Sequence, residues 1–201
     1  FFFKQKTAYE IYQCDWSSDV CSSDLGTGAT VGKLNGLQNA MKSGIGSWTV
    51  ELEGRYKGVL VSALAAVNAV GDIRDPATGK IIAGARVAPN SMEFADGARL
   101  MKGGTPSGFT RGNTTLVCVA TNAKLDKIQA TKVAQLAHLG MARAIHPVNT
   151  MSDGDLVVAL SLGSASAPVD SIGVAAAEAV AEAILRAVNV APSLGGLPGL
   201  H

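Results

Sequence analysis

The chain has 201 residues, of which 47% are apolar and 16% are charged, and its formal net charge at pH 7 is +1. This length suits one domain of ordinary size. Its apolar runs stop short of the roughly 18 residues that a membrane helix requires, and no basic cluster interleaved with aromatic residues indicates nucleic-acid binding. The composition therefore argues against a membrane or nucleic-acid partner.

The first 25 residues differ in character from the rest of the chain. Residues 4–11 and 15–25 resemble a translated sequencing adapter, and the segment holds two of the three cysteines. We expect residues 1–25 to be non-native and to stand outside the fold, which leaves one domain over residues 26–201. Cys118, the single cysteine of that domain, excludes an internal disulfide and favours a reducing, cytoplasmic compartment.

Alternating and β-branched runs predict five strands, over residues 47–52, 57–70, 81–85, 114–121 and 155–162. The second and the fifth of these runs are apolar enough to be buried. A turn signal from Asp75 to Lys80 makes residues 81–85 the second arm of a hairpin. Residues 86–112 lose periodicity and gather glycine and proline, which predicts a long exposed connection.

Two helices are predicted, over residues 126–145 and 171–188, the second capped by Asp170. The apolar residues expected to face a core in these helices include Ile128, Val133, Val174 and Ile184. A frayed tail is expected from Ala191 onward. Paired strands followed by strand, helix, strand and helix indicate a layered α/β arrangement.

A glycine-rich segment with a lysine, residues 28–34, is similar to a phosphate-binding loop only in part. Its spacing is one residue short of that motif, and Leu34 stands where a metal-binding serine or threonine is needed. This mismatch argues against nucleotide binding. His138, His146 and His201 have no spacing typical of metal ligands, so we expect structural or surface roles for them.

The junction Asn113-Thr114 lies between the long connection and a predicted strand. Its plain interpretation is the polar start of that strand. Its functional interpretation is a bond that the protein cuts in itself, which would expose Thr114 as a new N-terminus. The α-amine of such a residue can act as the base for its own hydroxyl nucleophile, because its ordinary pKa of roughly 7.7–8.0 leaves a neutral fraction near physiological pH.

Asp153-Gly154-Asp155 precedes the last predicted strand. Two carboxylates spaced two residues apart point the same way in an extended segment, so they could orient a hydroxyl and an ammonium group together. The alternative is a turn of ordinary Asp-Gly chemistry.

Four segments, residues 26–33, 66–72, 112–124 and 151–155, resemble the P1 family of peptidases in sequence and in order. That family includes DmpA-like L-aminopeptidase/D-esterases, β-aminopeptidases and nylon-oligomer hydrolases. The resemblance implies an α-β-β-α sandwich of the N-terminal-nucleophile type. It also implies self-cleavage into an α-chain, residues 26–113, and a β-chain, residues 114–201.

The resemblance also implies the site. Thr114 would supply the hydroxyl and the α-amine, Asn68 would help to stabilise the oxyanion, and Lys33 would lie near the site. Asp153 and Asp155 match the nylon-hydrolase pattern, whereas the aminopeptidase branch carries Ser and Glu there. The implied substrate is a small peptide, amide or ester, the implied assembly is a homo-oligomer of processed units, and the mechanism needs no cofactor.

Other interpretations remain open from the sequence. The family has a substantial portion before the position of Gly26, so we expect the chain to be N-terminally truncated, poorly stable and inactive as written. A binding or assembly protein that has lost processing is one alternative. An ornithine acetyltransferase is another, although its characteristic segments are missing around Thr114. The sequence leaves the substrate open among α-peptides, β-peptides, D-esters and oligoamides.

Overall fold

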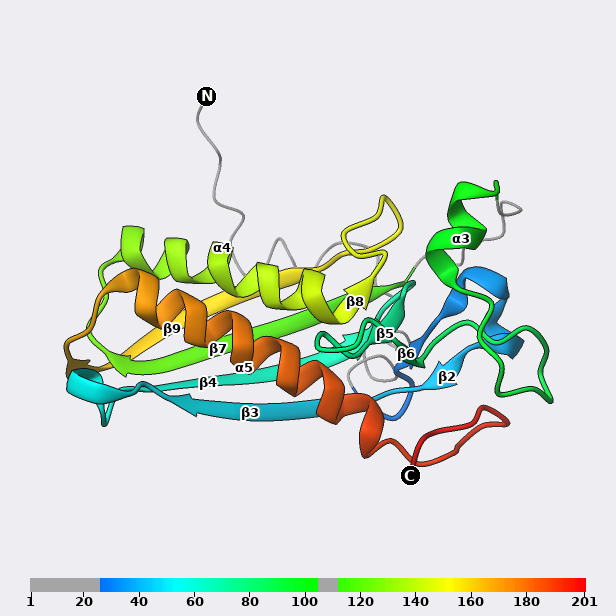
Figure 1. Ribbon diagram of the computed structural model, residues 1–201, viewed down its shortest axis with the longest axis horizontal. Coiled ribbons are helices and arrows are strands. Elements are labelled where there is room, and N and C mark those ends of the chain that lie inside the picture. Colours follow the sequence, from blue (N-terminus) through cyan, green and yellow to red (C-terminus); the bar gives the residue numbers. More distant parts are fainter. Residues whose placement is uncertain (1–25, 105–111) are drawn as a thin grey trace.

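The computed structural model describes residues 26–104 and 112–201 (Figure 1). The predicted non-native segment 1–25 lies outside these residues, as does part of the predicted long connection. The elements, in chain order, are β1 (Thr30–Val31), η1 (Lys33–Asn35), η2 (Leu37–Asn39), β2 (Met41–Lys42), β3 (Ile45–Glu51), η3 (Gly54–Tyr56), β4 (Leu60–Asn68), β5 (Asp72–Arg74), β6 (Ile81–Ala83), α3 (Gly97–Lys102), β7 (Thr114–Ala123), α4 (Lys127–Ala144), β8 (Ile145–His146), β9 (Leu156–Ala165) and α5 (Val169–Asn189).

The main sheet has four strands in the order β3-β4-β7-β9. The pairs β3–β4 and β4–β7 are antiparallel, and β7–β9 is parallel. A parallel pair needs a crossover connection, and the chain between β7 and β9 supplies it with α4 and the short strand β8. The register between β4 and β7 places Asn68 directly opposite Thr114, so the sheet itself brings two predicted site residues together.

Helices α4 and α5 lie side by side on one face of this sheet (Figure 1). Alternate residues of β7, beginning with Thr115, are buried beneath them. The two helices approach closely because Gly140 carries no side chain: a Cβ there would lie 2.0 Å from the carbonyl oxygen of Ala177. The largest fully buried side chains of the core are Met41, Ile73, Met141, Ile145, Ile172 and Ile184.

The other face of the sheet is open in the described part of the chain. It carries large apolar side chains that are 41–73% exposed, namely Ile45, Leu60, Leu64, Leu156, Val158, Leu160 and Leu162. The predicted strands 57–70 and 155–162 therefore exist as β4 and β9, but β4 is buried on both faces only over residues 65–68, and residues 156–162 of β9 are half-buried on one face and exposed on the other. Contiguous exposed apolar area of this kind is typical of a surface that another layer covers.

A second sheet, β6-β5-β8, lies at the end of β4. Its β5–β6 pair is the hairpin predicted around the turn at residues 75–80, which is thereby confirmed. The long connection is more ordered than expected, since α3 lies within it and Arg86 forms a β-bridge with Phe94.

Three predictions about the helices and the tail were wrong. Helix α5 begins at Val169 after Pro168, without a side-chain cap, so Asp170 lies in its first turn rather than at its cap. Ile128 and Val174 are 81% and 68% exposed. The tail is folded back, because Lys42 N–H donates to Pro198 O and His201 N–H donates to Ala191 O.

Candidate functional site around Thr114

Lys33 is carried to the sheet by a tightly held segment. Gly32 N–H donates to Gly71 O and Lys33 N–H donates to Val70 O, both at 2.9 Å. Gly32 has a φ of 73°, and a Cβ there would lie 2.0 Å from the backbone nitrogen of Ala85, so glycine is required. The backbone before the lysine side chain is therefore fixed on both sides.

The Lys33 ammonium group binds two asparagines. Its Nζ lies 2.5 Å from Asn68 Oδ1, 2.8 Å from Asn113 Oδ1 and 3.2 Å from the Asn68 carbonyl oxygen. Asn68 and Asn113 are only 2% and 4% exposed. Three acceptors match the three donors of an ammonium group, so the lysine joins β4 to the residue before Thr114.

The Asn68 amide is oriented by its partners. Its Oδ1 accepts from Lys33 Nζ and from Thr30 N–H at 3.2 Å, which leaves Nδ2 to donate to Gly112 O at 2.8 Å. The amide nitrogen of Asn68 thus contacts the carbonyl one residue before the Asn113 carbonyl that self-cleavage would attack.

Thr114 Oγ1 donates to the carbonyl oxygen of Asn113 at 2.7 Å. The same oxygen accepts the backbone N–H of Gly154 at 2.8 Å. Asn113 also forms a parallel bridge with Asp153. The hydroxyl therefore contacts the peptide unit on its N-terminal side, and an N–H from another segment contacts the same oxygen.

The two aspartates lie beside this peptide unit and bind its surroundings. Asp153 Oδ1 accepts Val70 N–H at 3.2 Å, and its Oδ2 accepts the Thr150 hydroxyl at 2.6 Å. Asp155 Oδ1 accepts Thr115 N–H at 2.7 Å. Burial raises the pKa of Asp155, and the Thr115 N–H opposes that shift. The acidic pair thus holds the backbone on either side of the site.

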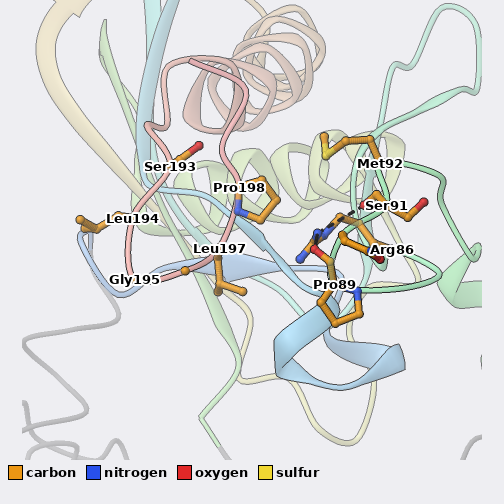
Figure 2. A pocket seen from close by; sticks show the side chains of 11 residues that line it. Arg86, Pro89, Ser91, Met92, Ser193, Leu194, Gly195, Leu197 and Pro198 are labelled. Atoms are coloured by element: carbon orange, nitrogen blue, oxygen red, sulfur yellow. Dashed lines mark hydrogen bonds between the residues drawn. The ribbon is translucent and has the colours of Figure 1, made fainter.

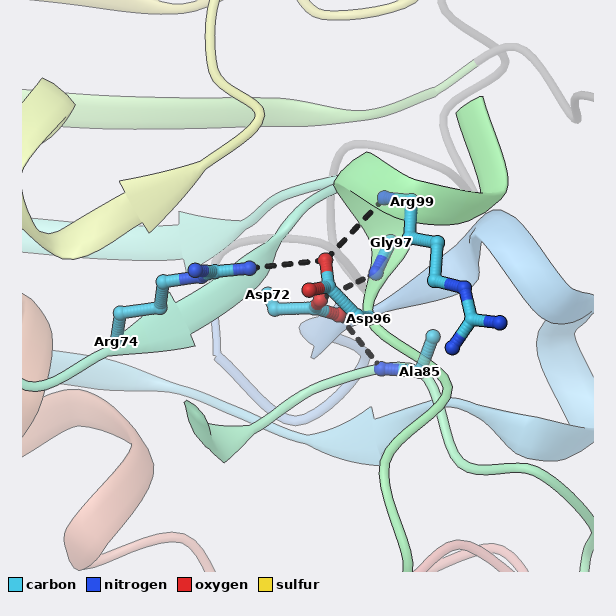
Figure 3. Close-up of polar contacts among 6 residues, drawn as sticks. All are labelled: Asp72, Arg74, Ala85, Asp96, Gly97 and Arg99. Atoms are coloured by element: carbon cyan, nitrogen blue, oxygen red, sulfur yellow. Dashed lines mark hydrogen bonds and ion pairs between the residues drawn. The ribbon is translucent and has the colours of Figure 1, made fainter. Parts of the chain in front are cut away.

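A buried carboxylate that the sequence did not predict binds two backbone N–H groups near the Lys33 segment; Figure 3 shows this carboxylate, Asp72, and its partners. Asp72 is fully buried, and its two oxygens accept Ala85 N–H at 2.7 Å and Gly97 N–H at 2.6 Å. Burial raises its pKa, against the effect of these two bonds. Because Ala85 lies against Gly32, Asp72 fixes the backbone on which the Lys33 segment rests.

A pocket of about 580 Å³ lies apart from these residues, between the segment 86–92 and the C-terminal loop 193–198 (Figure 2). Arg86 lies within it and is 2% exposed. Its guanidinium group donates to the carbonyl oxygens of Gln38, Ala40, Pro89 and Ser91. The pocket shares no lining residue with the cluster around Thr114.

No group of three His, Cys, Asp or Glu residues in the described ranges could hold a metal ion. His138 binds Asn149 Oδ1 at 2.9 Å instead. Within residues 26–104 and 112–201, no helix is both long and apolar enough to cross a bilayer.

Curated proteins similar to the chain include proteins named as aminopeptidases and as 6-aminohexanoate-oligomer endohydrolases. An uncharacterized aminopeptidase of Mycobacterium tuberculosis (strain H37Rv) is 32% identical over 92% of this chain and 59% of its own length. A 6-aminohexanoate-oligomer endohydrolase of Kocuria sp. is 28% identical over 67% of this chain and 42% of its own length. The chain thus spans less than two thirds of the relatives that it matches.

Solved structures give the same fold. The β-aminopeptidase of Burkholderia sp. matches with a TM-score of 0.51 and 28% identity, over 81% of this chain and 44% of that one. The L-aminopeptidase D-Ala-esterase/amidase of Ochrobactrum anthropi, described as a variant of the Ntn-hydrolase fold, matches with a TM-score of 0.55 and 22% identity, over 79% and 43%. The predicted α/β fold of the N-terminal-nucleophile type is confirmed.

The sequence model of peptidase family S58 matches residues 17–201. This match begins inside the segment predicted to be non-native, and that prediction stays a prediction. The family match covers β1 to α5 and the cluster around Thr114, which consists of Lys33, Asn68, Asn113, Thr114, Asp153 and Asp155. The chain belongs to peptidase family S58.

Proposed function

We propose that the protein is a self-processing amide hydrolase that cuts its own Asn113–Thr114 bond and then uses Thr114 as its nucleophile. The observation that carries the proposal is the 2.7 Å hydrogen bond from Thr114 Oγ1 to the Asn113 carbonyl oxygen, within a cluster that also holds Lys33. Family S58 membership supports amide hydrolysis as the reaction class.

The self-cleavage step moves an acyl group from nitrogen to oxygen. Thr114 Oγ1 forms a bond to the Asn113 carbonyl carbon, the C–N bond to Thr114 breaks, and the hydroxyl proton passes to the departing nitrogen. Water then hydrolyses the resulting ester, which leaves a carboxylate on Asn113 and restores the Thr114 hydroxyl. The products are a chain ending at Asn113 and a chain that begins with a free amine beside its own nucleophile.

In turnover, the neutral Thr114 amine would accept the hydroxyl proton while Oγ1 attacks a substrate carbonyl. The half-buried Lys33 ammonium and the Asn68 amide would favour negative charge on the oxygen under attack. Asp153 and Asp155 would hold the neighbouring backbone in place. The substrate class we propose is a small peptide, amide or ester, in keeping with the aminopeptidase and oligoamide-hydrolase relatives.

We also propose that processed units associate as a homo-oligomer. The exposed apolar side chains of the main sheet support this, since surfaces of that kind commonly mark interaction sites.

Intact mass and N-terminal sequencing of the purified complete gene product test the central proposal. The expected result is two chains, one beginning at Thr114. Thr114→Ala should leave one intact chain, whereas Thr131→Ala, which changes an exposed threonine on α4, should cleave normally. A single uncleaved wild-type chain without amidase activity would favour a binding or assembly protein instead.

A further inference from the structure

The carbonyl oxygen of Asn113 has two hydrogen-bond donors, and they behave differently during self-cleavage. The Thr114 hydroxyl, at 2.7 Å, loses its proton as it attacks. The backbone N–H of Gly154, at 2.8 Å, keeps its proton throughout. The Gly154 N–H is therefore placed to stabilise negative charge on this oxygen when the attack turns it into an oxyanion.

We propose that the main-chain N–H of Gly154 is an oxyanion donor for cleavage of the Asn113–Thr114 bond; this inference rests on the proposed self-processing. As Oγ1 bonds to the carbonyl carbon, the electron pair of the C=O bond moves to the oxygen that Gly154 N–H contacts. When the intermediate collapses, the pair returns, the C–N bond breaks, and the Thr114 nitrogen takes the proton. Donors fixed in place before the reaction are the effective ones.

The neighbours of Gly154 hold its N–H in position. On one side, Asp153 binds Val70 N–H and Thr150, and its backbone forms the bridge with Asn113. On the other side, Asp155 binds Thr115 N–H at 2.7 Å. This gives the two aspartates a shared positioning role, since together they fix the peptide unit between them against the bond to be cut.

The absence of a side chain at residue 154 leaves room for the nucleophile. A Cβ at Gly154 would lie 2.8 Å from Thr114 Oγ1 and 3.7 Å from the Asn113 carbonyl oxygen. The first separation is shorter than an ordinary carbon–oxygen contact, so a side chain would push the hydroxyl away. Gly154 is also exposed, which lets water reach the ester that the first step forms.

The Asn68 amide donates to a neighbouring carbonyl oxygen rather than to the Asn113 carbonyl oxygen. Its Nδ2 donates to Gly112 O at 2.8 Å in the uncleaved chain, one peptide unit before the reacting carbonyl. The sequence indicated the side-chain amide of Asn68 as an oxyanion donor. The donor proposed from the structure, the Gly154 N–H, is a main-chain group and has no side-chain signal in the sequence.

The test replaces the backbone N–H of residue 154 with an oxygen atom. Cell-free synthesis of the complete gene product with glycolic acid at position 154 turns the peptide N–H into an ester oxygen and adds no side chain. The matched control places glycolic acid at Gly58, whose N–H donates to Glu51 Oε1, also at 2.8 Å, at the far end of β4. A second variant, Gly154→Ala, keeps the N–H and adds the Cβ. Appearance of the Thr114 N-terminus is followed by mass, and limited proteolysis confines the comparison to folded chains.

Loss of one oxyanion donor slows a reaction by about 10²–10³-fold. We expect that loss with glycolic acid at 154 and normal cleavage with glycolic acid at 58, and we expect Gly154→Ala to slow cleavage too, because its Cβ displaces the Thr114 hydroxyl. If the 154 ester cleaves as fast as the 58 ester, the inference is wrong while self-processing stands. If the unsubstituted protein never forms the Thr114 terminus, both are wrong.

Discussion

Replacing Lys33 by methionine removes a positive charge beside the proposed cleavage site while keeping most of the side-chain volume. Three hydrogen bonds disappear, at 2.5, 2.8 and 3.2 Å, and the oxygen Oδ1 of Asn113 loses its lysine donor. Asn68 Oδ1 keeps the Thr30 N–H. We expect Lys33→Met to slow self-cleavage and to lower the free energy of unfolding.

Both magnitudes follow from this geometry. Hydrogen bonds to charged groups contribute about 1.5–3 kcal/mol each, but the ammonium also recovers its hydration when the chain unfolds, so a net loss of about 2–4 kcal/mol is expected. For the rate, the ammonium binds Asn113 Oδ1 at 2.8 Å and so lies near the carbonyl of the same residue. At an effective dielectric constant of about 20, a unit charge about 5 Å from an oxyanion stabilises it by about 3 kcal/mol, or roughly 10²-fold in rate.

Lys42→Met separates the two effects. Lys42 is buried, burial lowers its pKa, and its ammonium donates to the carbonyl oxygens of Thr27 and Ala29. It contacts no residue of the cluster around Thr114, so its replacement should cost stability without changing the cleavage rate of folded chains. Cleavage is followed by intact mass, as the appearance of the Thr114 terminus. Stability is measured separately, by urea unfolding with circular dichroism, in chains that also carry Thr114→Ala so that they stay whole. Equal cleavage rates for Lys33→Met and Lys42→Met would refute the electrostatic role.

Three further outcomes are expected. Gly140→Ala places a Cβ 2.0 Å from the backbone oxygen of Ala177, whereas Gly173→Ala meets the tip of the Leu136 side chain at 2.2 Å. Because only a side chain can move aside, urea unfolding should show a stability loss of at least 2 kcal/mol for Gly140→Ala and about 1 kcal/mol or less for Gly173→Ala. The raised pKa of Asp72 means that the folded state holds its proton more tightly than the unfolded state. The unfolding free energy of wild type relative to Asp72→Asn should therefore fall as pH rises from about 4 through the folded pKa. A difference that rises with pH would contradict this sign. Arg86→Met leaves four carbonyl oxygens without their donor and should cost about 3–5 kcal/mol of stability, while folded chains of the variant cleave at the wild-type rate by mass.

The strands and the hairpin could be predicted because each depends on local signals. Period-two alternation sets which residues of β7 are buried, and the Asp-Pro turn sets the β5–β6 pair. The same pattern could not say that one face of β9 is exposed, because both faces of that strand are apolar and the exposed face depends on which layers surround it.

The errors in the helices have a geometric cause. Residues advance about 100° each around an α-helix, so Ile128, five positions before Val133, points about 140° away from it. Val174 is likewise about 120° away from Val180. The buried stripe of α4 begins instead at Val133 and continues through Ala137, Gly140, Met141 and Ala144. Apolar character alone assigned residues to a face that their spacing excludes.

Some residues of the candidate site could be predicted from the sequence and others could not. Lys33, Asn68, Asn113 and Thr114 could be named from the sequence through family resemblance, and the structure brings them within hydrogen-bonding distance of one another. Asp72 could not be named, because its role depends on the N–H groups of Ala85 and Gly97, which are 13 and 25 positions away. A side chain whose partners are main-chain atoms of distant loops carries no local signal.

The arrangement has one consequence for how the site is built. Three of the polar side chains proposed for the site are also ties between segments: Lys33 joins β4 to Asn113, Asp153 joins the 150–155 loop to Val70, and Asp155 joins that loop to β7. Removing any one therefore changes folding and chemistry together, and a slow variant alone cannot assign a chemical role. The Gly154 N–H is also such a tie, because it joins the loop to Asn113, but an ester at residue 154 removes this one donor and leaves every side chain in place. Its removal without a change of side chain is for that reason the most direct probe of chemistry at this site.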